Sequence, residues 1–172
     1  MLVLLKLLQS LVRTLHSEGT PAQIAAGVAL GAALGLTPLL GLHNLFVVAA
    51  LALLNVSFGA GLLGFTLFAP IGFLLDPLFD RVGGVLLLRI ESLRPLWEFT
   101  DATPVVAWFN LNNTVVLGSI VGWLALFVPI YLLARLGVMR YRATVGERIA
   151  KSRAYQAIRA SRAYNVYRWF RE

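Results

Sequence analysis

Few side chains in this sequence could do chemistry, and most of them lie in or beside apolar stretches. The 172 residues include two histidines and no cysteine, which excludes disulfides, thiolate metal sites and cysteine nucleophiles. Neither His16 nor His43 has a serine or an acid at a spacing typical of a nucleophile and its base. Asp76 and Asp80 stand at i, i+4, but two ligands are too few for zinc. We therefore expect neither an enzyme nor a metal site nor a bound cofactor.

Polar residues within apolar stretches are the remaining candidates, because they are costly to place in a membrane and are often functional there. Two of them, His43 and Asn44, either take part in function or cap carbonyl groups that Pro38 frees. Asp76 either binds a proton or a headgroup, or pairs with Arg81. The candidate substrate path comprises Thr37, Pro38, His43, Asn44, Asp76, Asn110, Asn112 and Asn113.

The composition is that of an integral membrane protein. Hydrophobic residues make up 59% of the chain and charged residues only 13%, whereas about 25% of the residues in soluble domains are charged. Thr114–Ala134 is 21 residues long without a formal charge, and about 20 apolar residues suffice for a helix to cross the hydrocarbon core. We therefore expect this segment to be a transmembrane helix.

The last 38 residues are strongly basic, with ten Arg and Lys residues against Glu147 and Glu172. Because Lys and Arg are enriched on the cytoplasmic side of membrane helices, the tail is predicted to be cytoplasmic. A tail tethered to a bilayer should meet anionic lipid headgroups or a docking subunit rather than nucleic acid. The cations assigned to this binding are Arg140, Arg142, Arg148, Lys151, Arg153, Arg159, Arg162 and Arg168.

The N-terminal part predicts an interfacial helix followed by a helical hairpin. Residues 1–16 have polar and apolar positions at helical spacing, typical of a helix in the interface plane; the alternative is a first transmembrane helix with two buried charges. Thr20-Pro21-Ala22-Gln23 is typical of a capping box. As helices, the apolar stretches 21–36 and 42–54 would reach about 24 Å and about 20 Å, too short for a core of about 30 Å. We therefore predict a re-entrant hairpin with its tip at residues 37–44.

Three glycines predict a helix-packing surface on the first helix of this hairpin. Gly27, Gly31 and Gly35 recur at i, i+4 and i+8 and would form one face of small residues. Such a face typically lets another helix approach closely.

A full crossing is predicted next, followed by a mixed segment. Residues 57–75 are charge-free, with a kink expected at Pro70, and Asp76, Asp80 and Arg81 are predicted to mark the exit from the membrane. The charge balance and aromatic residues of the following segment, 89–113, suit the non-cytoplasmic interface.

The mixed segment contains a weak repeat of the hairpin tip. Thr103-Pro104 and Asn110 match Thr37-Pro38 and Asn44 at the same spacing, although a match this short also arises by coincidence. Pro-interrupted segments in corresponding positions are typical of an inverted repeat with its site at the repeat interface. One crossing between the copies would bring them in from opposite faces of the membrane.

Several stretches resemble one bacterial membrane family. They are Gly35-Leu36-Thr37-Pro38 with Gly41-Leu42-His43-Asn44, Asn55-Val56, Asp76-Pro77-Leu78-Phe79, and Phe109-Asn110 with Asn112-Asn113-Thr114-Val115-Val116-Leu117-Gly118-Ser119. Over residues 20–136 the sequence is similar to the family known as the domain of unknown function numbered 2062, and especially to its short stand-alone branch. The resemblance implies a polytopic inner-membrane protein without accepted enzymatic activity, with relatives sometimes fused to glycosyltransferases and a larger envelope protein as genomic neighbour. It assigns no catalytic residue.

These features predict an all-α integral membrane protein with about two full transmembrane helices. The expected parts are an amphipathic interfacial helix (1–16), a membrane domain (20–136) and a basic cytoplasmic helical tail (137–172). The chain should lie in the bacterial inner membrane with both termini cytoplasmic. Two functions fit it: a non-enzymatic component that moves a lipid or polyprenyl-linked lipid together with a larger envelope protein, or a structural anchor of an envelope complex. Membrane lipids are expected partners, a homo-oligomer is compatible with the sequence, and nucleic acid is not expected.

Overall fold

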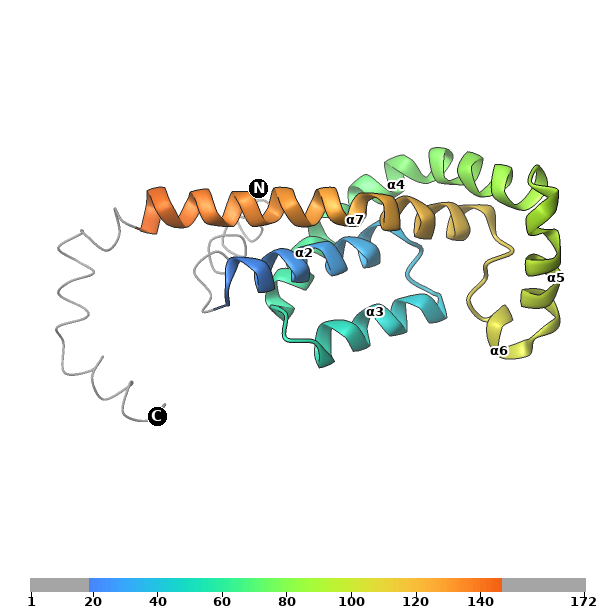
Figure 1. The fold of residues 1–172 in the computed structure, drawn as a ribbon, viewed down its shortest axis with the longest axis horizontal. Coiled ribbons are helices and arrows are strands. Elements are labelled where there is room, and N and C mark those ends of the chain that lie inside the picture. Colours follow the sequence, from blue (N-terminus) through green and yellow to red (C-terminus); the bar gives the residue numbers. More distant parts are fainter. Residues whose placement is uncertain (1–18, 147–172) are drawn as a thin grey trace.

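A computed structural model describes residues 19–146, and all regular structure in that range is helical. Two long helices, α4 (Phe58–Leu88) and α7 (Thr114–Tyr141), run antiparallel to each other, and a hairpin of α2 and α3 lies beside them (Figure 1). The remaining bounds are Pro21–Leu36 for α2, Leu42–Leu53 for α3, Glu91–Leu93 for the 3₁₀ turn η1, Arg94–Ala102 for α5, Pro104–Ala107 for α6 and Arg142–Gly146 for the π-helical turn η2.

The length and composition of the two long helices support an all-α membrane fold. Phe58–Leu88 and Thr114–Thr144 are both long and apolar enough to cross a membrane. Only 28% of each apolar stretch is buried inside the protein. Most of these side chains therefore face outward, and Leu124, Leu133 and Phe73 are examples. A helix at the core of a soluble protein would bury such residues.

The hairpin has the predicted boundaries, and local chemistry explains them. At the start of α2, the Gln23 backbone N–H donates to Thr20 Oγ1 (3.2 Å), and the Thr20 N–H donates to Gln23 Oε1 (2.8 Å). This reciprocal pair is the capping box that the sequence predicts. The helix ends at Leu36 because Pro38 pushes Thr37 into an extended conformation (φ −106°, ψ 151°).

The predicted glycine face of α2 packs on α4. A Cβ added at Gly31 would overlap the carbonyl oxygen of Gly61, and one added at Gly27 would overlap that of Ser57. Gly35 meets the α4 backbone near Ala69 in the same way. Close backbone approach through small residues is a typical way to join helices in a membrane, and the packing role of these glycines is confirmed.

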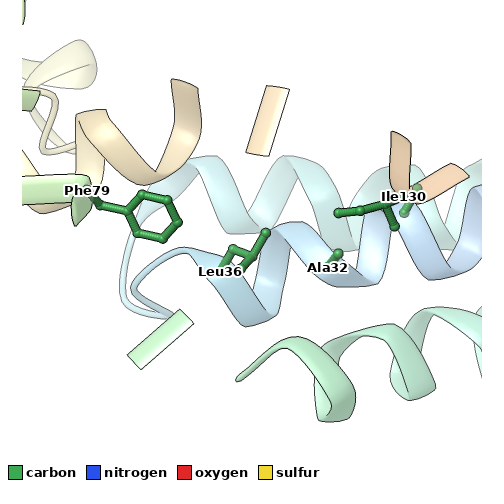
Figure 2. Packing of buried hydrophobic residues seen from close by; sticks show 5 residues of the cluster. Ala32, Leu36, Phe79 and Ile130 are labelled. Carbon is green, nitrogen blue, oxygen red and sulfur yellow. The ribbon is translucent and has the colours of Figure 1, made fainter. Parts of the chain in front are cut away.

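Helix α4 continues beyond the charge-free stretch, through Pro70 and Pro77, to Leu88. Each proline removes one backbone hydrogen bond from the helix. The neighbouring helices hold this segment: Gly72 packs on α2, and Phe79 is buried against α7. Figure 2 shows Ala32 and Leu36 of α2 meeting Phe79 of α4 and Ile130 of α7 in the shared core.

A second glycine seam, between α4 and α7, has no counterpart in the predictions from sequence. An added Cβ at Gly83 would overlap the carbonyl oxygen of Thr114, and one at Gly118 would overlap that of Phe79. The Thr114 hydroxyl also donates a short hydrogen bond to the Asp80 carboxylate at this crossing. The seam thus fixes the two long helices where the chain enters α7.

The predicted inverted repeat is not present. Thr103-Pro104 opens the four-residue helix α6 rather than a second hairpin, because the residues after Ala107 turn at once toward α7. The two Thr-Pro segments nevertheless meet, since the Leu42 N–H donates to the Trp108 carbonyl (3.4 Å). Stacking of the Phe46 and Phe109 rings, with centroids 5.7 Å apart, joins the same segments.

Candidate functional site

The tip of the α2–α3 hairpin is closed by a buried hydrogen-bond network. Asn44 donates from Nδ2 to the Pro38 carbonyl (2.7 Å) and accepts at Oδ1 from the Thr37 hydroxyl (3.0 Å). The same hydroxyl lies 2.8 Å from the Ala33 carbonyl, which also accepts from the Thr37 backbone N–H (2.9 Å). Thr37 is 6% exposed and Asn44 5% exposed. Asn44 therefore closes the hairpin tip through one amide N–H and its side-chain oxygen.

His43, which precedes Asn44 on the same tip, has no such hydrogen bonds. Its ring packs directly over Gly41, where an added Cβ would overlap the imidazole. Both ring nitrogens are buried and have no hydrogen-bond partner among residues 19–146. The carbonyl groups of Pro38 and Phe109 lie near the ring, but neither makes a hydrogen bond of good geometry with it. A buried polar group left in this state needs an explanation, because its desolvation is uncompensated.

An apolar cavity of about 300 Å³ adjoins His43. It lies between the hairpin and α7, and Thr37 and His43 supply its polar atoms. No formal charge lines it. The lining residues are Leu30, Ala33, Thr37, His43, Phe46, Val47, Ala50, Phe109, Ile120 and Trp123.

Helix α3 forms a wall between this cavity and another hollow. On its other side, toward α4, a more open hollow of about 650 Å³ runs from the tip to Phe65. Of the residues of α3, Asn44 and Leu51 are the buried ones. The base of the hairpin is tied by a hydrogen bond from Gln23 Nε2 to Asn55 Oδ1 (2.8 Å). Helix α3 is thus held at its two ends and at Leu51. The rest of the helix has little packing against the protein.

Asp76 lies on α4 beside a smaller cavity of about 260 Å³ that Thr37 and Pro38 also line. It makes neither the predicted ion pair with Arg81 nor any other hydrogen bond or ion pair within residues 19–146. Its carboxylate is partly exposed. Asp76 and His43 therefore flank the same tip from its two sides without a protein partner there.

The three asparagines before α7 do not line the cavity. Asn113 caps α7 by accepting from the Val116 N–H (3.1 Å), and Asn112 is exposed. Asn110 has a positive φ of 54°, a backbone conformation that asparagine tolerates better than most residues, and its carbonyl accepts from the Asn113 N–H. These residues shape the loop that carries Phe109, so the eight predicted path residues do not form one continuous polar path.

The apolar lining is the part of the site that sequence reasoning missed. Ile120 and Trp123 come from α7 and Phe109 from the loop before it. Trp123 is held in place by a hydrogen bond from Nε1 to the Ala29 carbonyl (2.9 Å). Apolar residues in an apolar protein give no signal in the sequence, and the aromatic residues Trp108 and Phe109 were assigned to the membrane interface rather than to a cavity.

Two of the predicted binding cations lie within the described residues. Arg140 is exposed in the last turn of α7. Arg142 donates from Nη2 to the Gly19 carbonyl (2.8 Å) and so ties the end of α7 to the start of α2. Outside the described residues lie the predicted interfacial helix 1–16 and the cations Arg148, Lys151, Arg153, Arg159, Arg162 and Arg168.

No group of three or more metal-ligand side chains occurs within residues 19–146. The cavity beside His43 thus offers apolar walls and one imidazole, while the Asp76 carboxylate belongs to the separate cavity on the other side of the tip. That arrangement can bind an amphiphile through apolar contact and a small number of hydrogen bonds.

Comparison with known proteins gives two matches. The family model described as "Uncharacterized protein conserved in bacteria (DUF2062)" matches residues 6–145. An uncharacterised protein of Treponema pallidum (strain Nichols) is 29% identical over 156 residues, which cover 91% of this chain and 96% of the relative. No solved structure matches.

Proposed function

The chain belongs to the uncharacterised bacterial family DUF2062, and from that membership we propose that it is a non-enzymatic membrane component of envelope lipid transport. In this proposal the hairpin tip takes up a lipid or a polyprenyl-linked lipid from the bilayer. A larger envelope protein, which the family resemblance implies, works with it. The location that fits is the bacterial inner membrane.

The observation that supports this proposal is the apolar cavity beside His43, whose ring nitrogens have no hydrogen-bond partner among the described residues. It lies against Ile120 and Trp123, within the charge-free stretch of α7 that is long enough to cross hydrocarbon. A protein that only holds helices together has no need of a cavity there, since empty volume forfeits packing contacts. Loose packing along the middle of α3 would let the cavity widen.

The structural-anchor function stays as the second candidate, and a specific observation favours it. Most of the predicted polar path residues serve the fold itself: Thr37 and Asn44 close the hairpin tip, and Asn113 caps α7. The two glycine seams make a rigid three-helix unit that could hold a complex together.

Lipid movement in liposomes separates the two functions. Purified protein reconstituted with a fluorescent phospholipid should make the inner-leaflet label accessible to an added membrane-impermeant quencher. Protein-free liposomes should expose only their outer leaflet to it. A pure anchor would leave protein-containing and protein-free liposomes alike.

We further propose that both termini are cytoplasmic, so that α4 and α7 cross the membrane in opposite directions. The basic tail and the cations Lys6 and Arg13 favour this orientation. Reporter fusions after residue 172 and within residues 89–101 should then report opposite sides of the membrane. Reporters on one side would contradict the two-crossing orientation.

A further inference from the structure

We propose that the cavity beside His43 is a binding site for one acyl chain of a glycerophospholipid, with the ester carbonyl of that chain hydrogen-bonded to the His43 imidazole. This inference rests on the proposed function and deepens it by naming the lipid class. Nothing in the cavity is specific for a headgroup, so selection comes from the chain and its ester.

The shape of the cavity matches a chain that enters at one end and runs along α3. His43, Val47 and Ala50 are spaced at i, i+4 and i+7, so they share one face of that helix. From His43 to Ala50 this face extends about 10 Å along the axis. Apolar side chains border it, with Ile120 and Trp123 of α7 on the facing wall.

The polar end of the cavity lies beside a loop with an exposed tryptophan, which favours the level of the lipid esters. His43 is next to the Trp108–Phe109 loop, and Trp108 is 73% exposed. Exposed tryptophan is enriched at the boundary between hydrocarbon and headgroups. Ala50 lines the same cavity further along α3, and the α7 residues that line it belong to the charge-free stretch, which favours hydrocarbon depth for this end.

The chemistry of His43 selects an ester over a phosphate. A neutral imidazole has one N–H donor and one acceptor nitrogen, and here neither has a protein partner. An ester carbonyl can accept from the N–H. A phosphate would bring a full charge to a cavity whose lining carries no formal charge to balance it. Polyprenyl phosphates have no ester carbonyl and a charged head directly on the chain, and therefore fit this site poorly.

The test compares two lipids that differ only in this contact. The full-length protein is purified in detergent, stripped of lipid and mixed with equal amounts of dioleoyl phosphatidylethanolamine and its diether analogue. Retained lipid is counted by native mass spectrometry. We expect one lipid per protein and an approximately fivefold preference for the diester, the size of effect that one hydrogen bond gives.

Protein variants then locate the bound chain. Ala50→Phe fills the cavity and should abolish retention, whereas Ala52→Phe, on the exposed side of the same helix, should retain lipid like the wild type. His43→Phe should remove the preference for the diester, and His43→Gln, which keeps an N–H donor, should restore part of it.

Several results would overturn the proposal. Equal retention of the diester and the diether by wild-type protein excludes the ester contact, and this comparison holds even if His43→Phe does not fold. Equal retention by Ala50→Phe and Ala52→Phe excludes the cavity. Stronger retention of a polyprenyl phosphate excludes the lipid class. If the protein binds lipid as predicted but does not move it in liposomes, transport is refuted and the binding site is retained. If it moves lipid but shows no preference for the ester, the ester site is refuted and transport is retained.

Discussion

Gly83→Ala should destabilise the protein strongly, whereas Gly84→Ala, one residue further along α4, should have little effect. The Cβ added at Gly83 would overlap the Thr114 carbonyl, which belongs to the backbone of α7 and cannot rotate away. The space around Gly84 is open. Overpacking of this kind costs about 1–3 kcal/mol, and we expect the upper end of that range because α4 and α7 must move apart. The measurement is the thermal unfolding midpoint in detergent, with an expected decrease on the order of 10 °C for Gly83→Ala.

The neighbouring glycine is the matched control, since both substitutions add the same methyl group to the same helix. Gly84→Ala should even gain slightly from better helix propensity. Equal midpoints for the two variants would mean that α4 and α7 do not meet at Gly83 and Thr114. The same test applies to the α2 seam, with Gly31→Ala in the crowded position and Gly59→Ala in open space.

Asn44→Leu should also lower stability, by about 2–3 kcal/mol. The substitution removes the donor to the Pro38 carbonyl and the acceptor for the Thr37 hydroxyl, both at a buried tip. Asn113→Leu should cost about 1 kcal/mol, the value of one N-cap. The exposed neighbour Asn112 supplies the control, since Asn112→Leu should leave the unfolding midpoint unchanged. Midpoints in detergent check all three variants.

The opposite pattern would change the account of the tip. Wild-type stability in Asn44→Leu together with slowed lipid movement would return Asn44 to the substrate path. Its hydrogen bonds to Thr37 and Pro38 would then be incidental to folding. We expect instead that any loss of lipid movement in this variant follows the loss of folded protein.

Local signals in the sequence predict the hairpin well. The Thr20–Gln23 capping box, the stop at Thr37-Pro38 and the glycine face of α2 each depend on residues close together in the chain, and each is confirmed. The continuation of α4 through Pro77 to Leu88 was not predicted, because Asp76, Asp80 and Arg81 indicate only where the chain leaves the membrane. Packing against α2 and α7 keeps that segment helical, and such a tertiary effect has no local signature.

The candidate site could be predicted in part. Polar residues at the tip stand out in an apolar chain, so Thr37, His43 and Asn44 were found. The sequence could not predict which of these side chains has hydrogen-bond partners within the protein. Those partners depend on the geometry of the tip and on the approach of Phe109. The repeat of Thr-Pro led to a wrong topology because the matching Thr, Pro and Asn do not determine the length of the helix that follows them.

The central claim is that lipid passes through the cavity between α3 and α7, and the rate of lipid movement in liposomes for Ala50→Phe and Ala52→Phe tests it most directly. Both variants add the same ring to α3, but only Ala50 lines the cavity. Rates are expressed per folded molecule, so that stability does not enter the comparison. We predict a rate at the protein-free background for Ala50→Phe and a wild-type rate for Ala52→Phe. Wild-type rates in both variants would contradict the account, and background rates in both variants and in the wild type would leave the protein a structural anchor.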